Sequence, residues 1–71
     1  MGTEVGRYIK KYREELGLTQ IEVASKANIA QSSLAQFERE IKSPSSATLK
    51  VLADILGVTP NDLYGISTRP A

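Results

Sequence analysis

Amide and hydroxyl side chains cluster at residues 31–36, and this is where the 71-residue sequence is best suited to contact a partner. If residues 31–39 form a helix, Leu34 and Phe37 fall on one side of it. The other side then carries Ser32, Gln36 and Arg39, flanked by Gln31 and Ala35. Glutamine can bond N6 and N7 of adenine, and serine can bond several bases or phosphates. The alternative is an ordinary solvated helix face, but such a face is usually richer in Lys and Glu.

The preceding residues must hold this helix in place, and they predict a second short helix and a tight turn. Thr19 can cap a helix over residues 20–27, and Glu22 stands three residues later, which is the spacing of a capping box. Asn28 suits a sharp reversal because asparagine readily adopts a left-handed conformation. The stretch 19–39 therefore reads as two helices joined by a turn.

Three further helices are predicted around this pair. Residues 5–16 are predicted to form a helix with one apolar stripe, and Gly17 would end this helix. The stripe consists of Val5, Ile9, Tyr12 and Leu16. Gly2 or Thr3 is expected to cap this helix, and Ile21 is expected to be an apolar position of the helix over 20–27.

The last two helices are predicted from their caps. Ser45 should cap a helix that runs to about Leu56 and closes at Gly57. The sequence Thr59-Pro60-Asn61-Asp62 then supplies a cap, a proline at the first helical position and an acid in the first turn of a brief helix that ends near Gly65. We predict an all-α fold, a compact five-helix bundle.

Composition excludes several classes of site. The sequence has no cysteine and no histidine, so we expect no disulfide, no metal site and no cofactor. No apolar run approaches the ~20 residues that a membrane span needs, and a cytoplasmic protein is expected. Glu14-Glu15 or Glu38 with Glu40 could form a carboxylate pair, but no nucleophile accompanies them, so we expect no enzyme. The net charge of +1 predicts weak non-specific affinity for DNA.

Several motifs together resemble one known family. Gly17-Leu18-Thr19-Gln20, Val23-Ala24, the turn at Asn28 and Gln31-Ser32-Ser33-Leu34 are similar to the helix-turn-helix of the phage Cro and repressor type, the xenobiotic-response-element family. Phe37-Glu38-Arg39, Leu52-Ala53 and Leu56-Gly57-Val58-Thr59 continue the pattern, and the match runs from about residue 5 to residue 64. The resemblance implies a lambda-repressor-like fold and a sequence-specific DNA-binding transcriptional regulator, in particular a repressor. Its partner would be double-stranded DNA, and the helix over 31–39 would read the major groove.

The resemblance also assigns roles to individual residues. The expected DNA-binding set is Gln20, Gln31, Ser32, Ser33, Gln36, Arg39 and Lys42. In the family, the glutamine at the start of the second helix meets a phosphate and braces the recognition helix, and Arg39 and Lys42 would contact phosphates. Arg13 and Glu38 match an internal ion pair that ties the first helix to the third.

The sequence departs from the family pattern next to the third helix. Glu40 stands where the family usually has glycine, so either the helix continues past Arg39 or Glu40 takes a strained left-handed conformation. Ala30 is a poorer cap than serine or threonine. Ile41 replaces a residue that is usually polar or basic. The Ile41 departure and the low charge favour the alternative function, a protein-interaction module of the same fold such as an antitoxin or coactivator-like domain.

The C-terminal residues raise the question of assembly. The resemblance implies a homodimer on a palindromic site, formed through Leu63, Tyr64 and Ile66, although these side chains could instead close the core. We expect a DNA-binding domain over residues 1–66 and a tail or linker start over residues 67–71.

Overall fold

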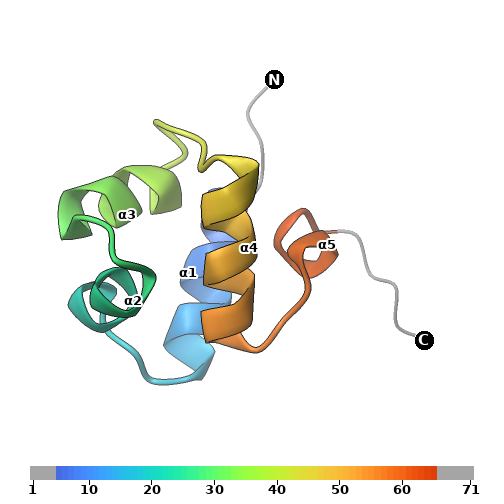
Figure 1. The fold of residues 1–71 in the computed structure, drawn as a ribbon. Helices are drawn as coiled ribbons and strands as arrows, with labels where there is room; N and C mark the ends of the chain where they lie inside the picture. Colours follow the sequence, from blue (N-terminus) through green and yellow to red (C-terminus); the bar gives the residue numbers. More distant parts are fainter. Residues whose placement is uncertain (1–4, 66–71) are drawn as a thin grey trace.

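Five helices make up the described part of the chain, residues 5–65 of a computed structural model (Figure 1). They are α1 (Val5–Glu15), α2 (Gln20–Ala27), α3 (Gln31–Glu38), α4 (Ser46–Leu56) and α5 (Pro60–Leu63). The described residues contain no strand, and the predicted all-α, five-helix fold is confirmed. The proposed caps Gly2 and Thr3, the dimer residue Ile66 and the tail over 67–71 lie outside the described residues.

Side-chain caps explain where three of the helices begin. At α2, Thr19 Oγ1 accepts from the Glu22 backbone N–H at 3.1 Å, and Glu22 Oε1 accepts from the Thr19 N–H at 2.9 Å. Thr59 and Asp62 form the same capping box at α5, and Ser45 caps α4. By contrast, Ala30 provides no side-chain bond at the start of α3. Each cap satisfies a backbone donor that the first turn leaves unpaired.

Left-handed residues end the helices and resolve the question at Glu40. Asn28 has a φ of 58° after α2, and Gly57 has a φ of 71° after α4. α3 ends at Glu38 with Arg39 as its C-cap, and Glu40 takes a φ of 63°. Of the two alternatives, the structure therefore shows the left-handed one, which costs a non-glycine residue about 1–2 kcal/mol.

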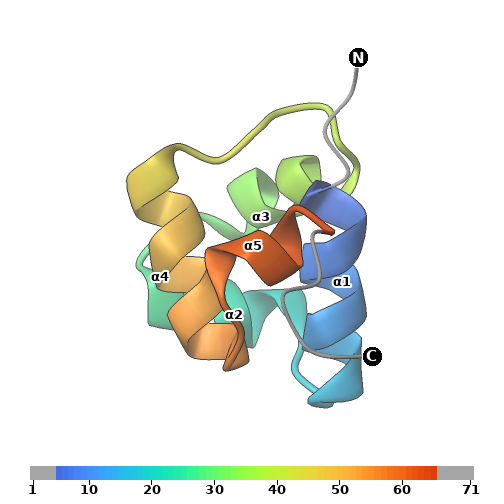
Figure 2. The same cartoon turned by 90° about the vertical axis from the view of Figure 1, so that its right-hand side faces the viewer.

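The helices surround one hydrophobic core. Figure 1 shows α2 and α3 on one side of α1 and α4, with α5 on the other side, and Figure 2 shows α5 in front of α1 and α4. The buried apolar residues come from all five helices: Val5, Ile9, Val23, Ala24, Leu34, Phe37, Leu49, Leu52, Ala53, Leu56 and Leu63. α3 packs against both α1 and α2, so its orientation depends on both.

Two sequence-based expectations about apolar residues are wrong, and the alternative left open for Leu63 is resolved in favour of the core. Leu16 is 53% exposed, because α1 ends at Glu15 and the helical stripe stops there. Ile21 is also exposed, since the buried side of α2 is formed by Val23 and Ala24. Leu63 is fully buried between α5 and the rest of the core and so is not available as a dimer surface. Only Tyr64, 47% exposed, remains a candidate for that role among the described residues.

A glycine near the start of α1 allows α1 and α3 to approach closely. A Cβ atom at Gly6 would lie 2.0 Å from the Phe37 carbonyl oxygen and 2.8 Å from Glu40 Cγ. Such distances are shorter than real Cβ contacts, so only glycine fits without a backbone shift. Gly6 therefore helps to set where the C-terminal end of α3 lies. None of the helices in residues 5–65 is long and apolar enough to cross a membrane.

Candidate nucleic-acid interface

α3 has one side in the core and one side in solvent. Leu34 is fully buried and Phe37 nearly so, and both belong to the core cluster. The solvent side carries the exposed residues Gln31, Ser32, Gln36 and Arg39, with Ser33 and Ala35 half-buried at its margins. The described residues thus leave an amide- and hydroxyl-bearing helix side uncovered, which is the surface that the sequence predicted for α3.

An ion pair joins α1 to the C-terminal end of α3. Arg13 Nε donates to Glu38 Oε2 at 2.7 Å, and Arg13 Nη2 donates to Glu38 Oε1 at 3.0 Å. The side chains of Arg13 and Glu38 are only 11% and 3% exposed. The hydrogen bond to Glu38 raises the pKa of Arg13 above its ordinary value. This bidentate geometry is the strong form of an arginine–carboxylate pair.

Arg13 also connects to the segment before α2. Its Nη1 donates to the Leu18 carbonyl oxygen at 2.8 Å. One guanidinium therefore holds three parts of the chain: its own helix, the end of α3 and the residue that precedes the Thr19 cap. Arginine is suited to this because its donors form a rigid planar fork.

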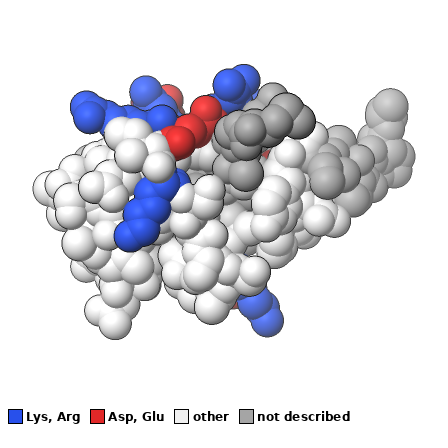
Figure 3. Space-filling view, turned by 90° about the horizontal axis from the view of Figure 1, so that it is seen from above, with Lys and Arg blue, Asp and Glu red and all other residues white. Residues whose placement is uncertain are grey.

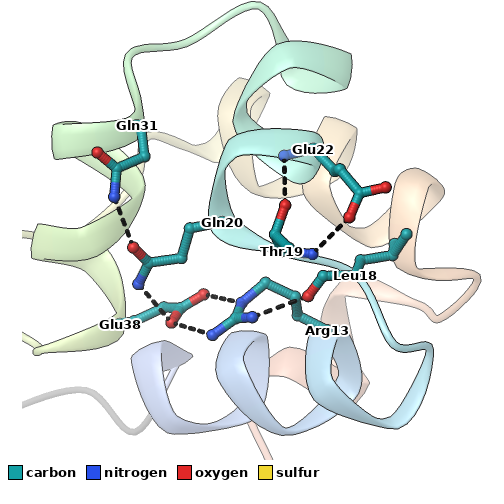
Figure 4. A network of polar contacts seen from close by, with 7 residues as sticks. All are labelled: Arg13, Leu18, Thr19, Gln20, Glu22, Gln31 and Glu38. Carbon is teal, nitrogen blue, oxygen red and sulfur yellow. Dashed lines mark hydrogen bonds and ion pairs between the residues drawn. The ribbon is translucent and has the colours of Figure 1, made fainter.

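The polar contacts continue from Glu38 to the exposed start of α3 (Figure 4). Glu38 Oε1 accepts from Gln20 Nε2 at 3.0 Å, and Gln20 Oε1 accepts from Gln31 Nε2 at 2.8 Å. We call Arg13, Glu38, Gln20 and Gln31 the polar chain. It links the interior of the domain to the residue at the N-terminus of α3 (Figure 4). No buried side-chain nitrogen or oxygen in the described part of the protein lacks a partner.

Charges are sparse on α3 itself and more frequent around it. Arg39 and Lys42 are exposed at the end of α3 and in the following loop. Glu40 lies between Arg39 and Lys42 in the sequence. Its Oε2 is 3.7 Å from Arg7 Nε on α1, so this carboxylate faces α1. In Figure 3, Lys and Arg side chains lie along the upper edge of the face beside acidic side chains, and others lie on the left part of the face and at its lower edge, while most of the face is uncharged. The described residues contain no group of three or more side chains suited to hold a metal ion.

All seven residues of the expected DNA-binding set fall within the described residues. Gln31, Ser32, Gln36, Arg39 and Lys42 are exposed, whereas Gln20 and Ser33 are half-buried. Their contacts with DNA stay a prediction. The family resemblance implied that Gln20 braces the recognition helix, but sequence reasoning identified neither its hydrogen bond with Gln31 nor the close approach at Gly6. The first could have been suspected because both glutamines open helices on either side of one short turn.

Comparisons with known proteins place this geometry among related chains. A family model described as helix-turn-helix matches residues 9–63. The chain is 42% identical over 64 residues to the immunity repressor protein of Bacillus phage phi105, a match that covers 90% of the chain and 44% of the repressor. It is 38% identical over 71 residues to the uncharacterized HTH-type transcriptional regulator y4dJ of Sinorhizobium fredii, with 92% of each chain covered.

A solved structure shares the arrangement of the helices. The master regulator for biofilm formation SinR, in complex with DNA, superposes with a TM-score of 0.78 at 37% identity, covering 83% of this chain and 95% of that one. The chain spans about half the length of most of the curated relatives it matches, and 44% of the phage repressor.

Proposed function

This chain belongs to the helix-turn-helix family, and from that premise we propose that it is the DNA-binding domain of a transcriptional repressor. The observation that carries the proposal is the exposed amide- and hydroxyl-bearing side of α3, whose opposite side is locked into the core. A helix fixed in this way can present its side chains to the major groove without rearrangement. This function implies a cytoplasmic location and involves no catalytic step.

The proposed interface separates base contacts from phosphate contacts. Gln31, Ser32 and Gln36 are the base readers, because their side chains project from the exposed side of α3 and can both donate and accept. The phosphate contacts come from residues around α3, namely Gln20, Ser33, Arg39 and Lys42. Phosphate contacts fix the register of the domain on the duplex and base contacts select the sequence.

We propose that two copies bind a palindromic site. Half-sites one helical turn apart, about 34 Å, would each receive one α3. Among the described residues, the surface that supports this is the exposed ring of Tyr64 at the end of α5. A Tyr64→Ala variant should therefore raise the dimer dissociation constant while leaving the melting temperature nearly unchanged.

A protein-interaction module is the second candidate, and one observation favours it. Ile41 is 69% exposed in the loop after α3, next to the proposed interface. An exposed isoleucine beside a groove-reading helix is better suited to an apolar partner than to phosphate. With the net charge of only +1, this residue makes the alternative worth testing directly.

Selection from a random DNA pool, followed by affinity measurements at several salt concentrations, tests the proposal. Two cations per chain at the interface, Arg39 and Lys42, give four per dimer, so log K should fall with log salt at a slope of about −4. Lys42→Ala should reduce that slope by about 2 per dimer. Lys50→Ala removes the same charge from α4, and the slope should not change.

Two outcomes would contradict the proposal. One is a pool that shows no enriched sequence after repeated selection. The other is binding that depends on Ile41 and not on salt, which would favour the protein-interaction module.

A further inference from the structure

Glu38 is buried at the far end of α3, yet the polar chain connects it to Gln31 at the exposed start. We infer that Glu38 is a positioning residue that fixes the orientation of the Gln31 amide and thereby favours adenine over guanine at the base that Gln31 reads. The inference rests on the proposed function. Glu38 itself would touch no base.

The direction of the hydrogen bonds follows from the chemistry of a carboxylate. Glu38 is paired with Arg13 through both oxygens, and such a carboxylate accepts hydrogen bonds but donates none. Gln20 must therefore turn its NH₂ group toward Glu38, which leaves its carbonyl oxygen toward Gln31. Gln31 then has to donate to that oxygen. Each amide orientation is set by the one before it, and the series starts at Glu38.

The fixed orientation determines what Gln31 can still offer to DNA. One of its two N–H donors is used on Gln20, so one N–H and the carbonyl oxygen remain. Adenine presents an acceptor at N7 and a donor at N6, and this pair matches one donor and one acceptor. Guanine presents two acceptors, N7 and O6, of which a single remaining N–H can satisfy only one. An adenine at this position is therefore favoured.

A purely structural role for Glu38 predicts a different outcome. Loss of the ion pair would then lower the stability of the fold and weaken binding to every sequence alike. Preference at one base position would not change. The ratio of affinities for adenine and guanine at that position therefore separates the two roles.

The experiment uses the selected site and a set of sites with single purine exchanges. Gln31→Ala first identifies the base position that Gln31 reads. Glu38→Gln replaces the carboxylate by a group that both donates and accepts, so Gln20 is free to reverse. At that position, the adenine-to-guanine ratio should fall by at least about fivefold, the lower end of what a bidentate contact supplies. Preferences at other positions should stay as in the wild type.

Two further variants keep the test decisive if Glu38→Gln folds poorly. Gln20→Leu leaves the Arg13–Glu38 pair intact but removes the link to Gln31, and it should lower the same ratio. Glu40→Gln removes the same charge near the end of α3 without touching the polar chain. It should raise the affinity for all sites together and leave the ratio unchanged.

The side-chain amide resonances of Gln31 give a measurement without DNA. In the free protein they should shift in both Glu38→Gln and Gln20→Leu and not in Glu40→Gln. An unchanged adenine-to-guanine ratio in Gln20→Leu, at a position that Gln31→Ala relaxes, would overturn the inference and leave the proposed function standing. A wild-type chain that selects no sequence would instead contradict the proposed function.

Discussion

Replacing Gly6 by alanine tests the contact that places the C-terminal end of α3. The new Cβ would lie 2.0 Å from the carbonyl oxygen of Phe37, and a real contact needs more than 3.0 Å. The obstacle is backbone, so it cannot be relieved by a side-chain rotation. Either α1 or the end of α3 must move, and Glu40 Cγ, which would be 2.8 Å away, must move as well.

The size of the effect follows from two opposing contributions. Overpacking of this kind costs about 1–3 kcal/mol. Alanine is favoured over glycine within a helix by up to about 1 kcal/mol, and the gain is smaller in the first turn, where Gly6 lies. We expect a net loss of about 1–2 kcal/mol. In a domain of this size the melting temperature should fall by about 5–15 °C.

Thermal unfolding followed by circular dichroism measures this loss, and amide resonances of the Phe37–Glu40 segment report the movement of α3. Gly17→Ala is the matched control, because Gly17 has a φ of 71° and nothing within 4 Å of its added Cβ. It should cost about 1–2 kcal/mol of backbone strain without shifting the α3 resonances. A Gly6→Ala protein as stable as the wild type, with unmoved α3 resonances, would refute the close approach.

Three further predictions concern the ion pair, the strained residue and one cap. Arg13→Ala should lower the free energy of unfolding by about 3–5 kcal/mol, because it strands the buried Glu38, and should weaken DNA binding only through unfolding; a stable but inactive protein would contradict this. Glu40→Gly should raise the free energy of urea unfolding by about 1 kcal/mol by relieving the left-handed strain, whereas Glu40→Ala, which keeps the strain, should not. The hydrogen bond from the Thr19 backbone N–H lowers the pKa of Glu22. The contribution of Glu22 to stability is therefore present above the ordinary glutamate pKa and is lost as the pH falls through the lowered pKa of the folded state. Glu22→Gln should therefore flatten the dependence of urea midpoint on pH in the acid range, and an equally steep dependence would disprove the assignment.

Local signals in the sequence were enough to predict the fold. The capping boxes at Thr19 and Thr59 and the left-handed residue Asn28 act over three or four residues, so the sequence alone identifies them. The exposure of Leu16 was not predictable in this way. Periodicity shows which side of a helix is apolar but not at which residue the helix ends, and α1 ends at Glu15, one residue before Leu16.

The candidate site was predicted only in part. The exposed side of α3 follows from helical periodicity, and the ion pair of Arg13 with Glu38 was implied by the family resemblance. The resemblance also implied that Gln20 braces α3, but which residue of α3 it contacts, Gln31, depends on how α2 and α3 pack. The need for glycine at position 6 likewise depends on Phe37 at the end of α3, 31 residues later in the chain.

The central claim is that the exposed side of α3 selects a DNA sequence. The most direct test compares the wild type with the triple variant Gln31→Ala, Ser32→Ala and Gln36→Ala, after both are shown to melt at similar temperatures. The measurement is the ratio of affinities for the selected site and for a shuffled site at one salt concentration. We predict that this ratio collapses toward one in the triple variant while the affinity for shuffled DNA changes little, because Arg39 and Lys42 remain. An unchanged ratio would mean that DNA is read by another surface or not at all.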